Sequence, residues 1–222
     1  MQSTDSTEDK PAQDLFLLFS ILGLILVHPI LDGPIWGRAL LGFLTFVPLI
    51  IAMVRMSQKK ELVWPFAALL GAAFVCAVAA YVSGSQAVLA IQWALAAIAF
   101  AVSVAGLFTY LQAGTETRIT AGHLYTAGSI YLLLELLFFT LYSCIAAVFP
   151  DAFEKTSGGT TGQAVDLLYF SMATLTTVGY GDIVPVRGIA RMLAGLEATT
   201  GVLYVAITVS LLVSGYKGRA RP

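Results

Sequence analysis

The stretch TLTTVGYGDIVP, residues 174–185, contains the residues of this chain whose types and spacing are best suited to chemistry. Dehydrating a monovalent cation requires closely spaced oxygen ligands, and backbone carbonyls supply them without adding full charges. Gly179 and Gly181 can adopt backbone conformations that are closed to other residues, so the carbonyls of residues 177–180 can point toward one axis. The predicted ion ligands are Thr177 (carbonyl and hydroxyl), Val178, Gly179 and Tyr180. The alternative is an ordinary loop, because Gly and Asp favour turns.

The composition places this stretch in a membrane protein. Of the 222 residues, 58% are hydrophobic and 11% are charged, and the mean hydropathy is +0.85, which is outside the usual range of soluble proteins. A net charge of -1 provides no basic field for nucleic acid, so we expect no nucleic-acid partner. Cys76 and Cys144 both lie in apolar runs and predict neither a disulfide nor a metal site.

Six apolar runs approach or exceed the roughly 20 residues that a membrane-spanning helix needs. They are residues 15–31, 35–54, 62–82, 87–111, 123–149 and 189–216. The expected fold is therefore an all-α integral membrane protein with six transmembrane helices. Most Lys and Arg residues fall on the side that would carry both termini, which predicts cytoplasmic termini and an extracytoplasmic loop around the motif.

The polar stretch AGTETRITAG separates the first four runs from the last two. We therefore expect five regions in sequence order. They are a disordered cytoplasmic tail (1–14), a four-helix auxiliary domain (15–112), a cytoplasmic linker (113–122), a pore domain (123–216) and a second cytoplasmic tail (217–222).

The segment before the motif predicts a short helix. It has a possible N-cap at Thr160 or Thr161, and its apolar residues end near Leu175. This helix is too short to span, and irregular backbone at membrane depth must be hidden from lipid. We therefore expect a re-entrant pore helix, followed by a loop over residues 176–182 that lines a cavity. The partly negative end of the helix would favour a cation by up to about 1 kcal/mol.

The residues TTVGYGD at 176–182 resemble the selectivity filter of potassium channels, and the resemblance covers about residues 123–216. It implies passive conduction of K⁺ and a homotetramer in the lipid bilayer, because that family places four pore units around one axis. Residues implied to support the filter are Thr176, Gly181, Asp182, Tyr169 and Phe170. The resemblance also makes Gly201 a candidate gating hinge, with close helix packing as the alternative.

Two features depart from some members of the family: the residue at position 173, and the aromatic pair Tyr169 and Phe170, neither of which is tryptophan. Ala173 stands where certain bacterial relatives carry a glutamate, so a carboxylate pair with Asp182 cannot form. Tyr169 could offer its hydroxyl to Asp182, whereas Phe170 can only pack. The filter must therefore be stabilised in another way.

Two acids, Glu135 and Glu197, fall inside the last two apolar runs, where an unpaired charge is costly. Each is either a proton- or ion-sensitive group near the pore or a neutral, hydrogen-bonded acid that holds helices together; we favour the second reading for Glu135. His28 and His123 lie near the ends of runs, where we expect solvated side chains.

The fourth run has no charged residue, so steep voltage gating through it is not expected. The leading hypothesis is a potassium channel that is not an enzyme and has no cofactor besides the transported ion. The alternatives are a poorly selective cation channel, a non-conducting membrane subunit and an ion-coupled potassium transporter. A single intact motif argues against the transporter, whose chains usually contain four degenerate pore loops. No constellation of catalytic residues supports an enzyme.

Overall fold

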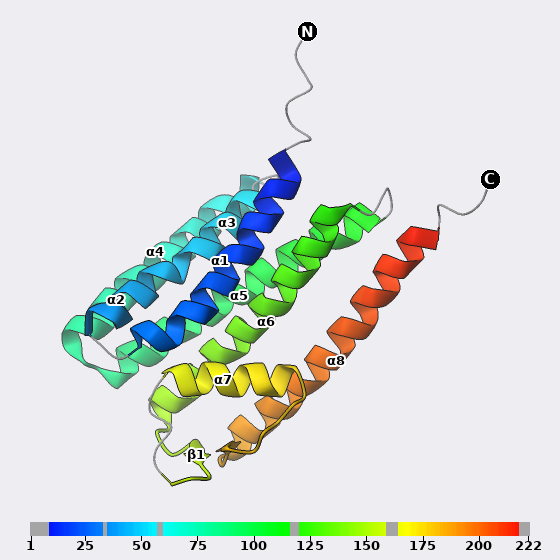
Figure 1. Ribbon diagram of the computed structural model, residues 1–222. Helices are drawn as coiled ribbons and strands as arrows, with labels where there is room; N and C mark the ends of the chain where they lie inside the picture. The colour runs from blue at the N-terminus through cyan, green and yellow to red at the C-terminus, as the bar shows by residue number, and fades with distance from the viewer. Residues whose placement is uncertain (1–8, 33–34, 57–59, 116–119, 159–163, 218–222) are drawn as a thin grey trace.

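The computed structural model describes residues 9–32, 35–56, 60–115, 120–158 and 164–217 (Figure 1). The described helices are α1 (Asp9–Leu31), α2 (Ile35–Leu44), α3 (Phe46–Met56), α4 (Lys60–Ser83), α5 (Gln86–Thr115), α6 (Ala121–Val148), α7 (Ala164–Leu175) and α8 (Gly188–Lys217). A small sheet joins β1 (Phe153–Lys155) to β2 (Ile183–Pro185).

Five of the described helices, α1, α4, α5, α6 and α8, are long and apolar enough to cross a membrane. The chain is therefore a multi-pass, essentially all-α membrane protein, as the sequence predicts. The start of α1 and the end of α8 lie at the same end of the bundle (Figure 1).

The predicted second span forms two shorter helices, α2 and α3, instead of one. Thr45 lies between them, and both its amide and its hydroxyl bond to the Leu41 carbonyl, at 2.9 and 2.8 Å. Pro48 explains the break, because it has no N–H for the carbonyl of Leu44 and its ring crowds that carbonyl. The count of six spans therefore stays a prediction.

The helix ends correct three expectations. Helix α1 begins at Asp9, within the predicted tail 1–14, since Pro11 is compatible with a first helical turn. His123 is buried and its Nδ1 accepts a 3.0 Å bond from the Thr120 amide at the start of α6. His28 is also buried and packs edge-on against Phe139. The prediction that both histidines are solvated is therefore wrong.

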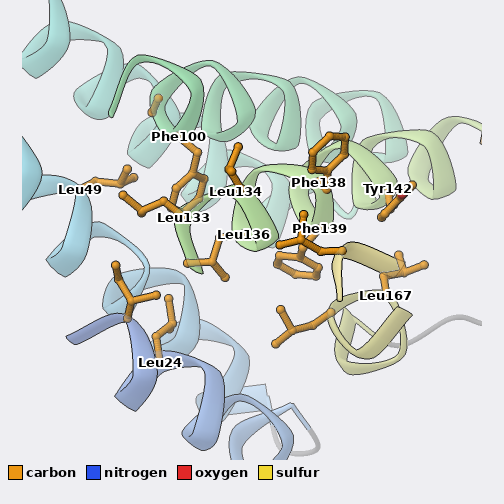
Figure 2. Packing of buried hydrophobic residues seen from close by; sticks show 14 of the residues in the cluster. Leu24, Leu49, Phe100, Leu133, Leu134, Leu136, Phe138, Phe139, Tyr142 and Leu167 are labelled. Atoms are coloured by element: carbon orange, nitrogen blue, oxygen red, sulfur yellow. The ribbon is translucent and has the colours of Figure 1, made fainter. Parts of the chain in front are cut away.

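Helix α6 lies between the first helices of the chain and the pair α7 and α8 (Figure 1). Its buried face joins one hydrophobic cluster that includes residues from both the predicted auxiliary domain and the predicted pore domain. Figure 2 shows Leu24, Leu49 and Phe100 in this cluster beside Leu133 and Phe139 of α6. The two regions therefore share a core, and the boundary between them stays a prediction.

Candidate functional site

The short helix α7 is present where the sequence predicts it and ends at Leu175. Its predicted N-caps, Thr160 and Thr161, lie outside the described residues. Among the described residues, the Asp32 carboxylate, directly after α1, accepts a 3.0 Å hydrogen bond from the Val165 amide. That bond satisfies one of the free N–H groups at the helix start. The end of α1 thus contacts the start of α7 directly. No local sequence signal could have predicted this contact.

We predict that Asp32→Ala destabilises the protein by about 1 kcal/mol per chain, the usual cost of losing an N-cap acceptor. Asp32→Asn should cost less, because the amide oxygen can still accept the bond from Val165. Thermal unfolding of the purified protein in one detergent would compare the variants. Equal stability of the Ala and Asn variants would contradict a capping role.

The C-terminus of α7 fixes the start of the motif through backbone hydrogen bonds. The Ala173 carbonyl accepts bonds from the amides of Val178 and Gly179, at 2.9 and 3.0 Å. The Thr174 carbonyl accepts one from the Thr177 amide at 2.9 Å. These bonds use carbonyls that a helix end would otherwise leave free. Ala173 therefore supports the motif with its backbone, although its side chain cannot pair with Asp182.

The backbone of the motif alternates in the sign of φ. Thr177, Gly179 and Gly181 have positive φ angles of 59°, 53° and 77°. Val178 and Tyr180, which lie between them, do not have a positive φ. Such alternation turns successive N–H groups toward one side and the carbonyls toward the other. Because the amides of Val178 and Gly179 point at α7, the carbonyls of Thr177 and Val178, which belong to the same peptide groups, face away from it. The sequence predicts this freedom for the two glycines but not for Thr177, a β-branched residue in an unfavourable conformation.

Residues 176–182 are all exposed in the single chain. Val178 is 54% exposed and Tyr180 is 70% exposed, although both are large and apolar or aromatic. The site therefore consists of a row of carbonyls along a surface that the chain itself leaves open.

The far end of the motif is held by β1, an element that the sequence did not indicate. Strand β1 pairs antiparallel with β2, directly after the motif. Thr156, next to β1, donates its amide to the Asp182 carbonyl at 2.9 Å and its hydroxyl to the Gly181 carbonyl at 2.7 Å. The missing glutamate is therefore offset by bonds from the segment between α6 and α7.

Two ion pairs connect this segment to its neighbours. Lys155 lies 2.8 Å from Asp166 of α7, and Arg187 lies 2.8 Å from Asp151. The hydrogen bonds from Arg187 lower the pKa of the exposed Asp151 carboxyl. The first pair ties β1 to α7, and the second joins parts of the chain on either side of the motif.

The aromatic residues expected to support the filter lie on different sides of α7. The Tyr169 ring stacks on Tyr180 with a centroid distance of 6.0 Å, and its hydroxyl lies near the Asp182 carboxylate. Phe170 is buried and packs edge-on against Tyr142 and Phe153. Tyr169 thus contacts the motif itself, whereas Phe170 anchors the helix in the core. The supporting role of Thr176, whose hydroxyl bonds the Met172 carbonyl at 2.7 Å, stays a prediction.

The two intramembrane acids have different surroundings. Glu197 is fully buried, and its two carboxyl oxygens bond the Tyr142 and Ser171 hydroxyls, each at 2.5 Å. Glu135 is 3% exposed, and its Oε1 has no hydrogen-bond partner among the described residues. Glu197 therefore hydrogen-bonds residues of α6 and α7, and the roles of Glu197 and Glu135 stay predictions.

Gly201 allows close contact between α8 and the end of α7. A Cβ atom at this position would lie 2.1 Å from the Leu175 carbonyl oxygen. Tyr131 of α6 donates a 3.3 Å hydrogen bond to the same oxygen. The structure thus contains the close packing that was the alternative to a hinge, and the hinge itself stays a prediction.

Comparisons with known proteins agree with this geometry. The model of a family described as Ion channel matches residues 127–216. Two-pore potassium channel 4 of Arabidopsis thaliana is 35% identical over 101 residues, which are 45% of this chain and 34% of that protein. Inward rectifier potassium channel Kirbac3.1 of Paramagnetospirillum magnetotacticum is 31% identical over 87 residues, 39% of this chain and 27% of that protein.

A third relative, the potassium voltage-gated channel protein Shal of Drosophila melanogaster, is 33% identical over 64 residues, 28% of this chain and 11% of that protein. The chain thus spans about a third or less of the length of these relatives. No solved structure matches it. The part of the chain that includes α7, the TTVGYGD motif and α8 is therefore similar to an ion-channel family and to proteins described as potassium channels.

Proposed function

We propose that this protein is a potassium-selective channel of the cell membrane. Four copies surround one axis, and K⁺ passes through a filter formed by the carbonyls of residues 177–180 and the Thr177 hydroxyl. Both termini lie in the cytoplasm, and α7 re-enters the membrane from the other side. The K⁺ ion binds without a further cofactor.

The observation that carries this proposal is the alternating φ along the motif. With the amides of Val178 and Gly179 bonded to α7, the carbonyls of Thr177 and Val178 face away from that helix, and the same alternation of φ continues to Gly181. Successive carbonyls on one side can replace the water of a dehydrated cation. A β-turn needs at most two adjacent residues of positive φ, not three at alternate positions.

A recording in a planar bilayer tests this function. Purified protein would separate a potassium solution from a sodium solution, and we expect a reversal potential near the potassium equilibrium potential. A reversal potential near zero would indicate a poorly selective cation channel. An intact assembly without current would indicate a non-conducting subunit.

We predict a homotetramer, because one exposed motif cannot surround an ion. In a single chain, only 17% of the most apolar part of α8 is buried, whereas 61% of the corresponding part of α6 is buried. Much of α8 is therefore free to contact other copies or lipid. Four chains of 23.6 kDa give about 94 kDa before detergent is added. Light scattering with detergent correction would measure this mass, and a conducting monomer or dimer would contradict the prediction.

We also predict weak voltage dependence. The spanning part of α5, Gln86–Gln112, contains no Asp, Glu, Lys or Arg. Each charge that moves through the field gains about 2.3 kcal/mol per 100 mV, so this helix contributes no gating charge. Open probability in symmetric potassium should therefore change little between positive and negative voltages. Steep activation would show that another element senses the field.

A further inference from the structure

One buried carboxyl group joins the three helices of the pore domain. Glu197 of α8 bonds Tyr142 of α6 through Oε2 and Ser171 of α7 through Oε1, and all three side chains are fully buried. Ser171 Oγ also lies 2.9 Å from the backbone carbonyl of Glu135 on α6. The Ser171 hydroxyl therefore stands between two oxygen atoms.

Counting protons defines the state of Glu197. Three O···O contacts each need one proton: Tyr142 to Glu197, Ser171 to Glu197, and Ser171 to the Glu135 carbonyl. The two hydroxyl groups supply one proton each, and a peptide carbonyl supplies none. If Glu197 were ionised, one of the three contacts would have no hydrogen atom between its two oxygens. A protonated Glu197 supplies the third proton when its Oε1 carries it: Oε1 donates to Ser171, Ser171 donates to the Glu135 carbonyl, and Tyr142 donates to Oε2.

Among the residues that the structure describes, the groups that face Glu197 carry no positive charge. The titratable groups that face it are Tyr142, Tyr131 and the second acid, Glu135, all on α6; α7 contributes the Ser171 hydroxyl. The cations of two ion pairs, Lys155 with Asp166 and Arg187 with Asp151, are held by other acids. A buried carboxylate without a cation is strongly disfavoured.

Ser171 and Tyr142 place this group directly behind the filter. Ser171 lies two residues before Ala173, whose carbonyl holds the amides of Val178 and Gly179. The Tyr142 ring packs edge-on against Phe170 of α7 and Phe153 of β1. Loss of a hydrogen bond at Glu197 would therefore alter the position of α7. The filter backbone would move with α7, because its amides are bonded to the end of that helix.

We propose that Glu197 is a positioning residue that works as an uncharged carboxylic acid, fixing α7 between α6 and α8 so that the filter keeps its conducting geometry. The expected effect on conduction rests on the proposed channel function. The protonation state of Glu197 does not depend on that function. Removing this proton from Glu197 leaves the acid as a carboxylate with one contact unpaired, and α7 loses its fixed position. Conduction should then fall as the solution becomes more alkaline.

Glu197→Gln tests the proposal, because the amide copies a neutral acid: its NH₂ donates to Ser171 and its C=O accepts from Tyr142. We expect potassium flux into liposomes to match the wild type at neutral pH and to lose the alkaline decline. Glu197→Ala should lower flux per tetramer by about tenfold, since it leaves buried hydroxyls unpaired. Tyr142→Phe, which keeps the ring but removes one bond, should give an intermediate loss.

An infrared measurement decides the protonation state without any flux. The difference spectrum of wild type minus Glu197→Gln at neutral pH should contain the C=O stretch of a protonated carboxylic acid. A carboxylate band in its place would overturn the proposal. An intact Gln tetramer without flux, or a Gln chain that does not assemble, would also overturn it. A wild type that conducts nothing while the protonated band is present would refute the channel function and leave the state of Glu197 established.

Discussion

Gly179→Ala should abolish potassium-selective flux while leaving the tetramer assembled. Gly179 has a φ of 53°, and a left-handed conformation costs a residue with a Cβ about 1–2 kcal/mol. In a ring of four chains the cost would sum to roughly 4–8 kcal/mol. The filter has little reserve against this cost, because Thr177 already holds a positive φ in every chain. Flux of K⁺ and of Na⁺ into liposomes, at matched tetramer content, would measure the effect.

Gly84 provides a matched control for this substitution. It has a φ of 62°, and a Cβ there would meet no atom within 4 Å, as at Gly179. Gly84→Ala therefore introduces the same backbone strain between α4 and α5, far from the motif, and should reduce stability but not selectivity. Thr177→Ala should be milder than Gly179→Ala, because it removes a hydroxyl ligand but keeps the carbonyl. Unchanged selectivity in Gly179→Ala would refute the filter assignment.

The long helices follow from the sequence because their physics is local. Apolar runs of 20 or more residues predict α4, α5, α6 and α8 to within a few residues, since lipid admits hardly any other backbone structure. The break between α2 and α3 was missed, although Pro48 is visible in the sequence. The local sequence does not distinguish a proline in the first turn of a new helix from a proline inside a continuous helix. Pro65, inside α4, shows the second outcome.

The ion ligands could be named from their motif, but most of their supports could not. Asp32 caps a helix 133 residues away, and Thr156 bonds a carbonyl 25 residues away. Nothing in the local pattern of either residue distinguishes it from an ordinary loop residue, because the partner is chosen by packing. The prediction for His28 and His123 was wrong for the same reason. Their positions near helix ends indicated solvated side chains, whereas both are buried against aromatic residues of neighbouring helices.

Gly201→Ala should reduce both the stability of the assembly and its potassium flux. The added Cβ would lie 2.1 Å from the Leu175 carbonyl oxygen, a backbone atom that cannot rotate away. Helix α8 must then move away from the end of α7, at a cost of about 1–3 kcal/mol per chain for overpacking. Leu175 directly precedes the motif, so the displacement reaches the filter.

Gly195 lies on the same helix and provides the control, because a Cβ there would meet no atom within 4 Å. Gly195→Ala should leave flux unchanged and stabilise the helix by up to about 1 kcal/mol, the usual gain of Ala over Gly. Thermal unfolding of the tetramer and liposome flux would be measured for both variants. A hinge at Gly201 predicts a different result: its Ala variant would be as stable as the Gly195 variant and as selective as wild type, but would open at a different frequency. That outcome would show that flexibility, and not close contact with Leu175, is the reason for glycine at this position.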